Sequence, residues 1–335
     1  MKSAIVGCGN IAQVHGRVLT EWIDTQLVGA VDTDIEKAQK CAHVWQTKAY
    51  GSLEEMLRHE RLDVLHICTP HNLHVPMAEY ALARNIHVFM EKPPVISWEQ
   101  FQRLKQALDS TEAKLGFCYQ NRFNPSVQET KNILSSGRAG RILGARGIVT
   151  WNRGAAYYTE STWHGRLASE GGGVLINQAI HTLDLLQYLL GRPLAVEASM
   201  TNHHLKNVIE VEDTMEAYIR FERDVCASFY ATNAYCADVP PLVEIICENM
   251  KIRMEDLELT IFYPDGSQEK PKLEYREALG KSYWGTGHRY CIMEFYQALE
   301  QGNRFALDLP AMEESIRLML GVYESARDGR VVELV

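Results

Sequence analysis

The chain has 335 residues, and its 46% content of hydrophobic residues is sufficient to bury the cores of two domains. Its formal net charge of −9, without any Lys/Arg-rich segment, argues against nucleic acid or an anionic membrane as a partner. No apolar run approaches the roughly 18 residues of a membrane span, and the N-terminus enters a predicted strand without a signal-peptide core.

The eight cysteines are scattered and include no Cys-x-x-Cys pair. Several lie in apolar, strand-like segments, which is typical of reduced packing residues in a cytoplasm. Their spacing offers no zinc site. We therefore expect a cytoplasmic protein without a metal ion.

A dinucleotide-binding pattern opens the chain. Residues 3–6 form a predicted strand, Gly7-Cys8-Gly9-Asn10-Ile11-Ala12 follows, and a helix is predicted to about Trp22. Gly7 permits a tight turn, and Gly9 lets the backbone approach a pyrophosphate held at the helix N-terminus. The order of strand, turn and helix predicts a nucleotide site.

A second predicted strand, residues 27–31, ends at Asp32, at the spacing that this pattern requires. Its carboxylate is expected to accept hydrogen bonds from the adenosine ribose and to repel a 2′-phosphate, which favours NAD. Lys37 is near enough in sequence to reach a phosphate, so NADP stays possible. The alternative role of Asp32 is to cap the next helix, which Asp34 can also do.

Strands and helices then alternate. Helices are predicted at residues 53–58, 73–83 and 97–108, and strands at 64–68, 86–90 and 115–118. This rhythm predicts an α/β fold with a doubly wound parallel sheet of the Rossmann type. Within Thr69-Pro70-His71-Asn72-Leu73-His74, Asn72 and His74 are expected to contact the cofactor, and the alternative for Asn72 is a helix cap.

Glu91-Lys92-Pro93-Pro94 directly follows the predicted strand 86–90. A lysine at the carboxyl end of a parallel strand lies where open α/β sheets bind their ligands. Pro93 disfavours helical backbone at Lys92 and so directs its side chain outward from the strand end. The alternative is a surface lysine in a loop.

In this order and spacing, the motifs resemble the glucose–fructose oxidoreductase / inositol dehydrogenase (Gfo/Idh/MocA) family. The resemblance implies that Lys92 contacts both the nicotinamide and the reacting hydroxyl, and that the Lys92–Pro93 bond is often cis. It also implies that Gln120 or Asn121 lies beside the nicotinamide amide and that Trp163 closes over the nicotinamide. Polar linker residues and core packing are the respective alternatives.

A second informative stretch begins at Glu170. Gly171-Gly172-Gly173 is expected to be a flexible entrance to a helix on which Asn177, His181 and Asp184 form one polar stripe. Such a stripe is either satisfied internally, with Asp184 holding His181, or lines a site.

The family pattern at this stretch is Asp-x-Gly-x-His-x-x-Asp, and the resemblance makes its first Asp and its His catalytic. Asn177 stands at that Asp position, and an asparagine can hold a hydroxyl but cannot take its proton. Lys92, His181 and Asn177 are the predicted catalytic residues.

Further candidates complete the predicted site. Tyr157 and Tyr158 suit the apolar faces of a sugar, and His288, in a family-like Tyr283-Trp284-Gly285-Thr286-Gly287-His288, is expected in the pocket or at a helix start. The predicted cofactor-binding residues are Gly7, Gly9, Asn10, Ile11, Asp32, Thr69, Pro70, Asn72, His74, Glu91, Lys92, Gln120 and Trp163. The predicted substrate-binding residues are Lys92, Asn121, Arg122, Tyr157, Trp163, Asn177, His181 and His288.

Residues 195–262 read as antiparallel strands, which predicts a large, mostly antiparallel open sheet in a C-terminal α+β domain. We expect a dinucleotide-binding domain at 1–120 and a substrate-binding and oligomerisation domain at 121–335. An open sheet face favours self-association as a homodimer or homotetramer.

The sequence therefore predicts an NAD(P)-dependent dehydrogenase that transfers hydride between nicotinamide and a secondary hydroxyl of a sugar, a cyclitol or a derivative. Two alternatives stay open. One is a redox-neutral glycosidase that uses NAD, and the other is a non-catalytic regulator that senses NAD and sugar.

Overall fold

The computed structural model describes residues 1–275, 277–279 and 285–334, and within them the chain forms two compact units. The first comprises Met1–Gln120 and His288–Met312, and the second Asn121–Gly287 and Glu313–Val335. Tyr283 and Trp284 lie outside the described residues. Independent folding of each unit as a domain stays a prediction.

The segment 288–312 lies with the first unit, whereas it was expected in the second domain. The physical reason is its pairing with the last strand of the first sheet. The Phe117 N–H donates to the Leu307 carbonyl at 3.0 Å, and Gly116 bridges Asp308. The Phe295 ring packs against Phe89, with ring centroids 5.2 Å apart.

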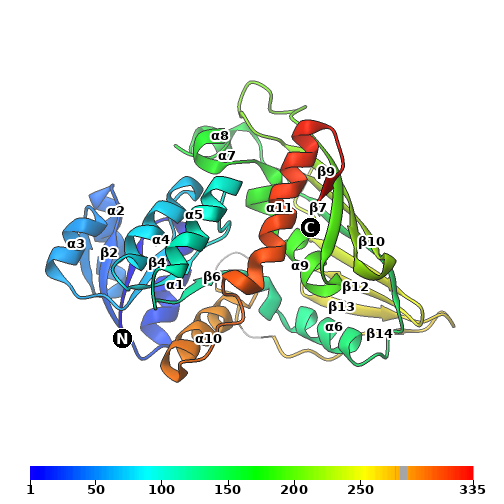
Figure 1. Ribbon diagram of the computed structural model, residues 1–335, viewed down its shortest axis with the longest axis horizontal. Helices are drawn as coiled ribbons and strands as arrows, with labels where there is room; N and C mark the ends of the chain where they lie inside the picture. Colours follow the sequence, from blue (N-terminus) through cyan, green and yellow to red (C-terminus); the bar gives the residue numbers. More distant parts are fainter. Residues whose placement is uncertain (276, 280–284, 335) are drawn as a thin grey trace. The chain divides into compact units, whose positions relative to one another are not determined.

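In the described part of the first unit, six strands form a parallel sheet in the order β3-β2-β1-β4-β5-β6 (Figure 1). The predicted doubly wound parallel sheet is confirmed. The order reverses between β1 and β4, and ligands of such sheets bind at this switch point. The elements are β1 (Lys2–Val6), α1 (Asn10–Glu21), β2 (Gln26–Val31), α2 (Ile35–Trp45), β3 (Lys48–Tyr50), α3 (Leu53–His59), β4 (Val64–Ile67), η1 (His71–Leu73), α4 (His74–Leu82), β5 (His87–Met90), α5 (Trp98–Asp109), β6 (Leu115–Phe117) and α10 (His288–Gln301).

In the described part of the second unit, nine strands form a mostly antiparallel sheet in the order β14-β13-β12-β11-β7-β10-β9-β8-β15. The predicted large open sheet is confirmed. The elements are η2 (Gln120–Phe123), which spans the boundary, α6 (Pro125–Ser135), β7 (Ile142–Thr150), α7 (Ala155–Thr159), α8 (Leu167–Glu170), a π-helical turn η3 (Leu175–Ala179), α9 (Ile180–Leu190), β8 (Pro193–Thr201), β9 (Thr214–Phe221), η4 (Glu222–Asp224), β10 (Cys226–Thr232), β11 (Leu242–Cys247), β12 (Lys251–Glu255), β13 (Glu258–Phe262), β14 (Gln268–Glu269), α11 (Leu309–Asp328), which also spans the boundary, and β15 (Val332–Glu333).

Strand β7 was not predicted, although it lies between β11 and β10 and pairs with β10 in parallel. Two glycines interrupt its apolar pattern, and helix packing explains one of them. A Cβ atom on Gly147 would lie 2.9 Å from Thr182 and 3.1 Å from Leu186 of α9. The missing side chain therefore lets α9 pack closely on the sheet.

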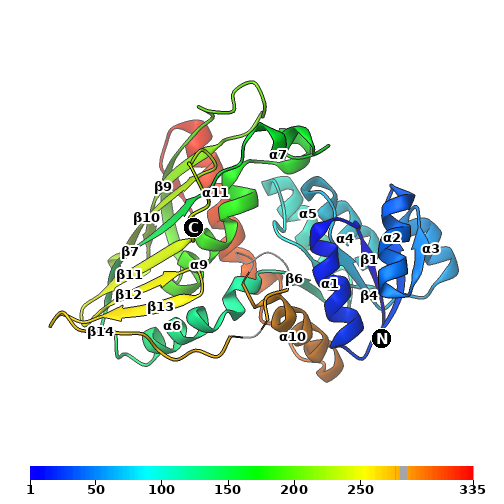
Figure 2. The same ribbon diagram turned by 180° about the vertical axis from the view of Figure 1, so that it is seen from behind.

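Figures 1 and 2 show α9 and α11 on one face of this sheet, and within the described residues no helix covers the other face. Alternate side chains of the uncovered face are exposed, including Tyr218 (48%), Tyr230 (36%) and Ile246 (39%). The same face also carries charged side chains, among them Arg146, Glu216 and Arg220. A sheet face of this mixed kind that is accessible in one chain is compatible with the expected self-association, which stays a prediction.

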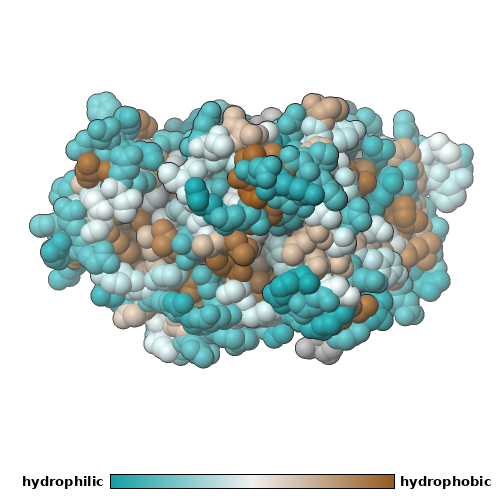
Figure 3. Space-filling model, turned by 90° about the horizontal axis from the view of Figure 1, so that it is seen from above, coloured by the Kyte–Doolittle hydropathy of each residue, from teal (hydrophilic) through white to brown (hydrophobic). Residues whose placement is uncertain are grey.

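On the face of the molecule drawn in Figure 3, hydrophilic residues predominate and hydrophobic residues form small, separate groups. In the described residues, no helix is long and apolar enough to cross a membrane.

The glycines before the π-helical turn are packing residues, and the expectation of a flexible entrance is wrong. A Cβ atom on Gly173 would overlap the Glu212 carbonyl oxygen, and one on Gly172 would overlap the Tyr323 hydroxyl. The buried Glu212 carboxylate accepts the N–H groups of Gly173 (2.8 Å) and Leu175 (3.1 Å), so it caps the helix start.

We predict that Gly173→Ala destabilises the protein by about 2 kcal/mol or more, because the new methyl group must displace backbone at Glu212. Gly154→Ala is the matched control, since a Cβ atom there meets nothing within 4 Å. Denaturant unfolding of both variants measures the difference. Equal stabilities would contradict the packing role of Gly173.

Candidate functional site

The turn after β1 leaves room for a ligand. Gly7 has a φ of +88°, and a Cβ atom there would lie 2.5 Å from the Cys68 carbonyl oxygen, so only glycine fits. Gly9 precedes α1 without a side-chain cap, and a Cβ atom on it would meet nothing within 4 Å. An uncapped helix start in open space fits a pyrophosphate.

Asp32 lies at the end of β2 and accepts the N–H groups of Cys8 (2.8 Å) and Asp34 (2.9 Å). It therefore ties the glycine turn to the second strand end. Asp34, whose side chain accepts from Glu36 and Lys37, is the residue that caps α2. Asp32 is thus in the position expected for a ribose contact.

The loop after β4 holds polar atoms that are buried without a hydrogen-bond partner in the described part of the protein, namely Thr69 Oγ1 and Asn72 Oδ1. Buried polar atoms without partners cost free energy, so they fit a site that a bound ligand completes. The alternative role of Asn72 is not observed, because α4 begins without a side-chain cap.

His74 connects two loops at this edge. Its Nδ1 atom lies 2.8 Å from the Pro93 carbonyl oxygen, and its Nε2 atom lies 3.0 Å from the Thr69 carbonyl oxygen. Burial lowers the pKa of His74, and a neutral imidazole donates to one of the two carbonyls. Its ring nitrogens thus hold protein groups, and its predicted cofactor contact stays a prediction.

The Lys92–Pro93 peptide bond is cis, as the family resemblance implied. Glu91 is buried, whereas Lys92 is partly accessible beyond the end of β5. The Lys92 N–H donates to Glu91 Oε2 at 3.2 Å. The loop thus presents a lysine at the ligand-binding edge and fixes its backbone on a buried carboxylate.

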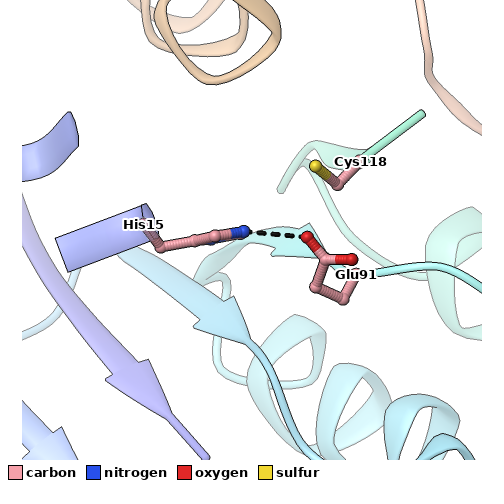
Figure 4. A group of neighbouring side chains, drawn as sticks. All are labelled: His15, Glu91 and Cys118. Carbon is pink, nitrogen blue, oxygen red and sulfur yellow. Dashed lines mark hydrogen bonds and ion pairs between the residues drawn. The ribbon is translucent and has the colours of Figure 1, made fainter. Parts of the chain in front are cut away.

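Glu91 forms a buried ion pair with His15 of α1, at 2.9 Å between Oε1 and Nε2 (Figure 4). Burial disfavours the charged imidazole, but the Cys118 thiol and the Glu91 carboxylate outweigh it and raise the pKa of His15 to about 9. Burial likewise opposes the shift at Glu91, where the His15 hydrogen bond holds the carboxyl pKa well below its usual range. Both groups are therefore charged at neutral pH.

Cys118 completes this cluster, and within the described residues the potential ligand atoms of His15, Glu91 and Cys118 lie within 4.8 Å of one another. The donor set does not require a metal ion. His15 and Glu91 neutralise each other, and burial raises the pKa of the Cys118 thiol, which keeps its proton.

His288 begins α10 and lies in the first unit. Burial lowers the pKa of His288 to about 4, against the opposing charge of Glu91, so its imidazole is neutral at pH 7. Gln120 is also buried there, and Cys118 donates to its Oε1 atom at 3.9 Å. A pocket role for either residue stays a prediction.

In the second unit, Asn177 lies in the π-helical turn Leu175–Ala179, so the expected continuous α-helix is wrong at this point. π-Turns inside helices are frequent at functional sites. The Asn177 amide nitrogen donates to the fully buried Glu170 carboxylate. Because a carboxylate only accepts, this bond orients Asn177 Oδ1 away from Glu170.

Aromatic rings lie beside Asn177. The Tyr157 hydroxyl is 3.5 Å from the Asn177 amide nitrogen, and its ring stacks on His164, which in turn contacts Trp163. Tyr157 and Trp163 are therefore grouped with Asn177, as expected for a sugar site. Tyr158 packs instead in a core with Leu205, Ile209 and Val211.

Arg122 forms a buried ion pair. Its buried guanidinium donates to both oxygens of Asp184, at 2.9 and 2.6 Å, and to Ser315 at 3.1 Å. Its charge is thus compensated inside the unit, and the expected substrate contact stays a prediction. Asp184 also accepts from Ser315. His181 lies in the turn that follows Asn177, and its orientation by Asp184 stays a prediction.

The sequence did not reveal several residues of these sites, namely His15, Cys118, His164, Glu170 and Glu212. The residues that they contact are distant in the sequence or belong to the irregular π-helical turn, so no local pattern marks them. Asn121 Oδ1 is a further buried atom without a partner in the described residues, which is compatible with its expected ligand contact.

We predict that His15→Gln destabilises the protein most near pH 6 and much less at pH 10. The pKa of His15 is about 9 in the folded protein and about 6.5 when unfolded. Its stabilising charge is therefore fully present below pH 6.5 and is lost as the pH rises through 9.

The measurement is denaturant unfolding of both proteins from pH 6 to pH 10, read as the difference in unfolding free energy. A difference that stays constant over this range would show that His15 carries no buried charge.

We predict that Asn177→Asp makes stability fall between pH 5 and pH 8. The variant places two carboxyl groups together, so the pKa of one rises above its unfolded value, and its stabilising proton is lost as pH rises. Thermal unfolding at both pH values measures the effect.

The double variant Glu170→Gln/Asn177→Asp restores one amide and one carboxylate and should recover the wild-type pH dependence. If the single variant already shows the wild-type dependence, Asn177 does not contact Glu170.

Two protein-family models match the chain. Residues 1–119 match the oxidoreductase family with an NAD-binding Rossmann fold, GFO_IDH_MocA, and residues 127–253 match the GFO/IDH/MocA C-terminal domain.

Among solved structures, the WlbA dehydrogenase from Bordetella pertussis in complex with NADH and UDP-GlcNAcA is similar over the whole chain. The TM-score is 0.87 at 27% identity, and the match covers 100% of this chain and 99% of that one.

Curated relatives match over shorter segments. A 1-carboxy-3-chloro-3,4-dihydroxycyclo hexa-1,5-diene dehydrogenase of Comamonas testosteroni is 29% identical over 68% of this chain and 57% of its own length. The D-glucoside 3-dehydrogenase of Escherichia coli K12 is 28% identical over 58% of this chain and 55% of its own length. The chain thus spans little more than half the length of these relatives.

Motifs, fold and family models agree from the glycine turn to the C-terminal sheet, and the chain belongs to the GFO/IDH/MocA family of oxidoreductases, with an NAD-binding Rossmann fold in its first 119 residues.

Proposed function

We propose that the protein is an NAD-dependent dehydrogenase that oxidises a secondary hydroxyl group of a sugar, a cyclitol or a close derivative. The observation that carries this proposal is Lys92 at the ligand-binding edge of the sheet, where its N–H donates to the buried Glu91 carboxylate. Bound NAD supplies the hydride acceptor. Asp32, the open Gly9 turn and the unpartnered atoms of Thr69 and Asn72 support its binding.

The proposed roles of the catalytic residues follow from their chemistry. His181 takes the hydroxyl proton as a general base. Lys92 stabilises the developing negative charge on the oxygen. Asn177 accepts a hydrogen bond from the neighbouring hydroxyl through the Oδ1 atom that its contact with Glu170 turns away from that carboxylate.

The substrate class rests on the aromatic group beside Asn177 and on the relatives. Tyr157 and Trp163 offer apolar ring faces to a sugar or cyclitol. The solved relative is a dehydrogenase in complex with NADH and UDP-GlcNAcA, and the curated relatives include a D-glucoside 3-dehydrogenase. Asp32 supports NAD over NADP, because its charge repels a 2′-phosphate.

Two further properties are part of the proposal. The exposed face that carries Tyr218, Tyr230 and Ile246 supports a homodimer or homotetramer through the second sheet. The eight unpaired cysteine thiols support a reducing, cytoplasmic location.

The test is NADH formation by the purified protein with NAD across inositols, free aldoses, glycosides and UDP-linked sugars, followed at 340 nm. We expect activity with at least one class and a preference for NAD over NADP. Cleavage of chromophoric glycosides without net NADH formation would favour the glycosidase alternative. Binding of NAD and sugar without turnover would favour the regulator.

We predict that Lys92→Ala and His181→Ala each lower turnover on the order of 10²-fold or more, because each removes a group that acts on the reacting hydroxyl. NAD binding, measured by calorimetry, should persist. Lys40→Ala and His203→Ala are matched controls, since both residues are exposed. Wild-type turnover in either active-site variant would remove that residue from the mechanism.

A further inference from the structure

A continuous chain of hydrogen bonds runs through the first unit from Glu91 to the N-terminus, and the proposed reaction does not account for it. Its members come from six separate segments of the sequence. The links are His15 Nε2 to Glu91 Oε1 (2.9 Å), His15 Nδ1 to His66 Nδ1 (2.9 Å), His66 Nε2 to Tyr296 Oη (2.9 Å), Tyr296 Oη to Ser3 Oγ (2.6 Å), Ser3 Oγ to Thr25 Oγ1 (2.9 Å) and Thr25 Oγ1 to the Met1 carbonyl oxygen (2.7 Å).

The chain leads from one edge of the sheet to the other. Glu91 follows the carboxyl end of β5, whereas Ser3 lies near the start of β1. The interior members, His15, His66, Tyr296 and Ser3, are each at most 2% exposed. Thr25 is partly exposed, so the chain reaches solvent at the amino edge.

Hydrogen counting gives this chain one extra proton. The Glu91 carboxylate and the Met1 carbonyl accept at the two ends, so all six links need a hydrogen from the five side chains between them. Each of these side chains supplies one hydrogen when neutral. The sixth must be an additional bound proton.

The surroundings place this proton on His15. Besides Glu91 and His66, the polar group that acts on His15 is the Cys118 thiol. The pKa of His15 is raised to about 9, whereas burial lowers the pKa of His66 well below its usual value. With a cationic His15 and a neutral His66, each of the six hydrogen bonds contains one hydrogen. From His15 to Thr25, each member then donates to the next member along the chain.

We propose that this chain is a one-proton relay between the Glu91–Lys92 loop and solvent at Thr25. In the outward direction, His15 gives its Nδ1 proton to His66, and His66 gives its Nε2 proton to the Tyr296 oxygen. The hydroxyls of Tyr296, Ser3 and Thr25 then each pass one proton on. Solvent gains one proton, His15 becomes neutral, and every other member keeps its charge.

The relay is reversible for one proton. After an outward transfer, every hydrogen of the relay points back towards His15, so one inward transfer restores the starting state. This role rests on the proposed function, because oxidation of an alcohol by NAD releases a proton and removes a positive charge from the cofactor. Because His15 loses or regains a proton through the relay, the net charge of the His15–Glu91 pair near Lys92 can change while the core stays closed.

The experiment measures proton exchange at His15 as the rate at which the ring interconverts between its cationic and neutral forms near pH 9, from ¹⁵N relaxation dispersion in NMR of the full chain labelled with ¹⁵N-histidine, without NAD or substrate. Tyr296→Phe removes the hydroxyl in the middle of the relay and keeps the ring. We expect exchange to slow roughly tenfold or more, because only rarer opening of the core remains as a path.

Ser3→Ala interrupts the relay at a second point, and Tyr80→Phe, on α4, is the control that should leave the rate unchanged. His15 exchange as fast as wild type, or faster, in both relay variants would overturn the proposal. A wild-type protein that forms no NADH with any substrate would contradict the proposed dehydrogenase, but it would not alter the exchange result. The two failures are therefore distinguishable.

Discussion

The buried contact between His15 and Glu91 is the interaction on which the candidate site of the first unit depends. Glu91 cannot be left alone in the interior, because an unpaired buried carboxylate costs several kcal/mol. His15 compensates its charge, and the carboxylate in turn accepts the N–H of Lys92. The lysine loop is thus held by a charge pair that the sequence separates by 76 residues.

The second constraint is the common edge of the parallel strands. The glycine turn, Asp32, the Thr69 loop and Lys92 all follow carboxyl ends of neighbouring strands, so the fold collects them without any long loop. In the second unit, two buried glutamates, Glu170 and Glu212, hold the π-helical segment through hydrogen bonds. One orients Asn177, and the other caps the helix start.

Features encoded by local patterns could be predicted from the sequence. The glycine turn, Asp32 at a strand end and the helix Trp98–Asp109 each depend on residues close in the chain. Strand β7 could not be predicted, because Gly147 interrupts its apolar pattern. A glycine at this position lets helix α9, which is distant in the sequence, pack closely on the strand. His66 and Tyr296, which meet across 230 residues, gave no signal for the same reason. The pairing of Arg122 with Asp184 was not predicted, because sequence alone does not reveal that a charged residue is paired inside the fold.

The protonation state of His15 is the central claim, since the charge of Glu91, the lysine loop and the hydrogen-bonded chain all follow from it. The most direct measurement is a titration of the ¹⁵N chemical shifts of His15 and His66 in the folded protein. We expect both ring nitrogens of His15 to stay protonated up to a pH of about 9 and His66 to stay neutral, with its proton on Nε2. A His15 that is neutral at pH 7, or a charged His66, would contradict this account.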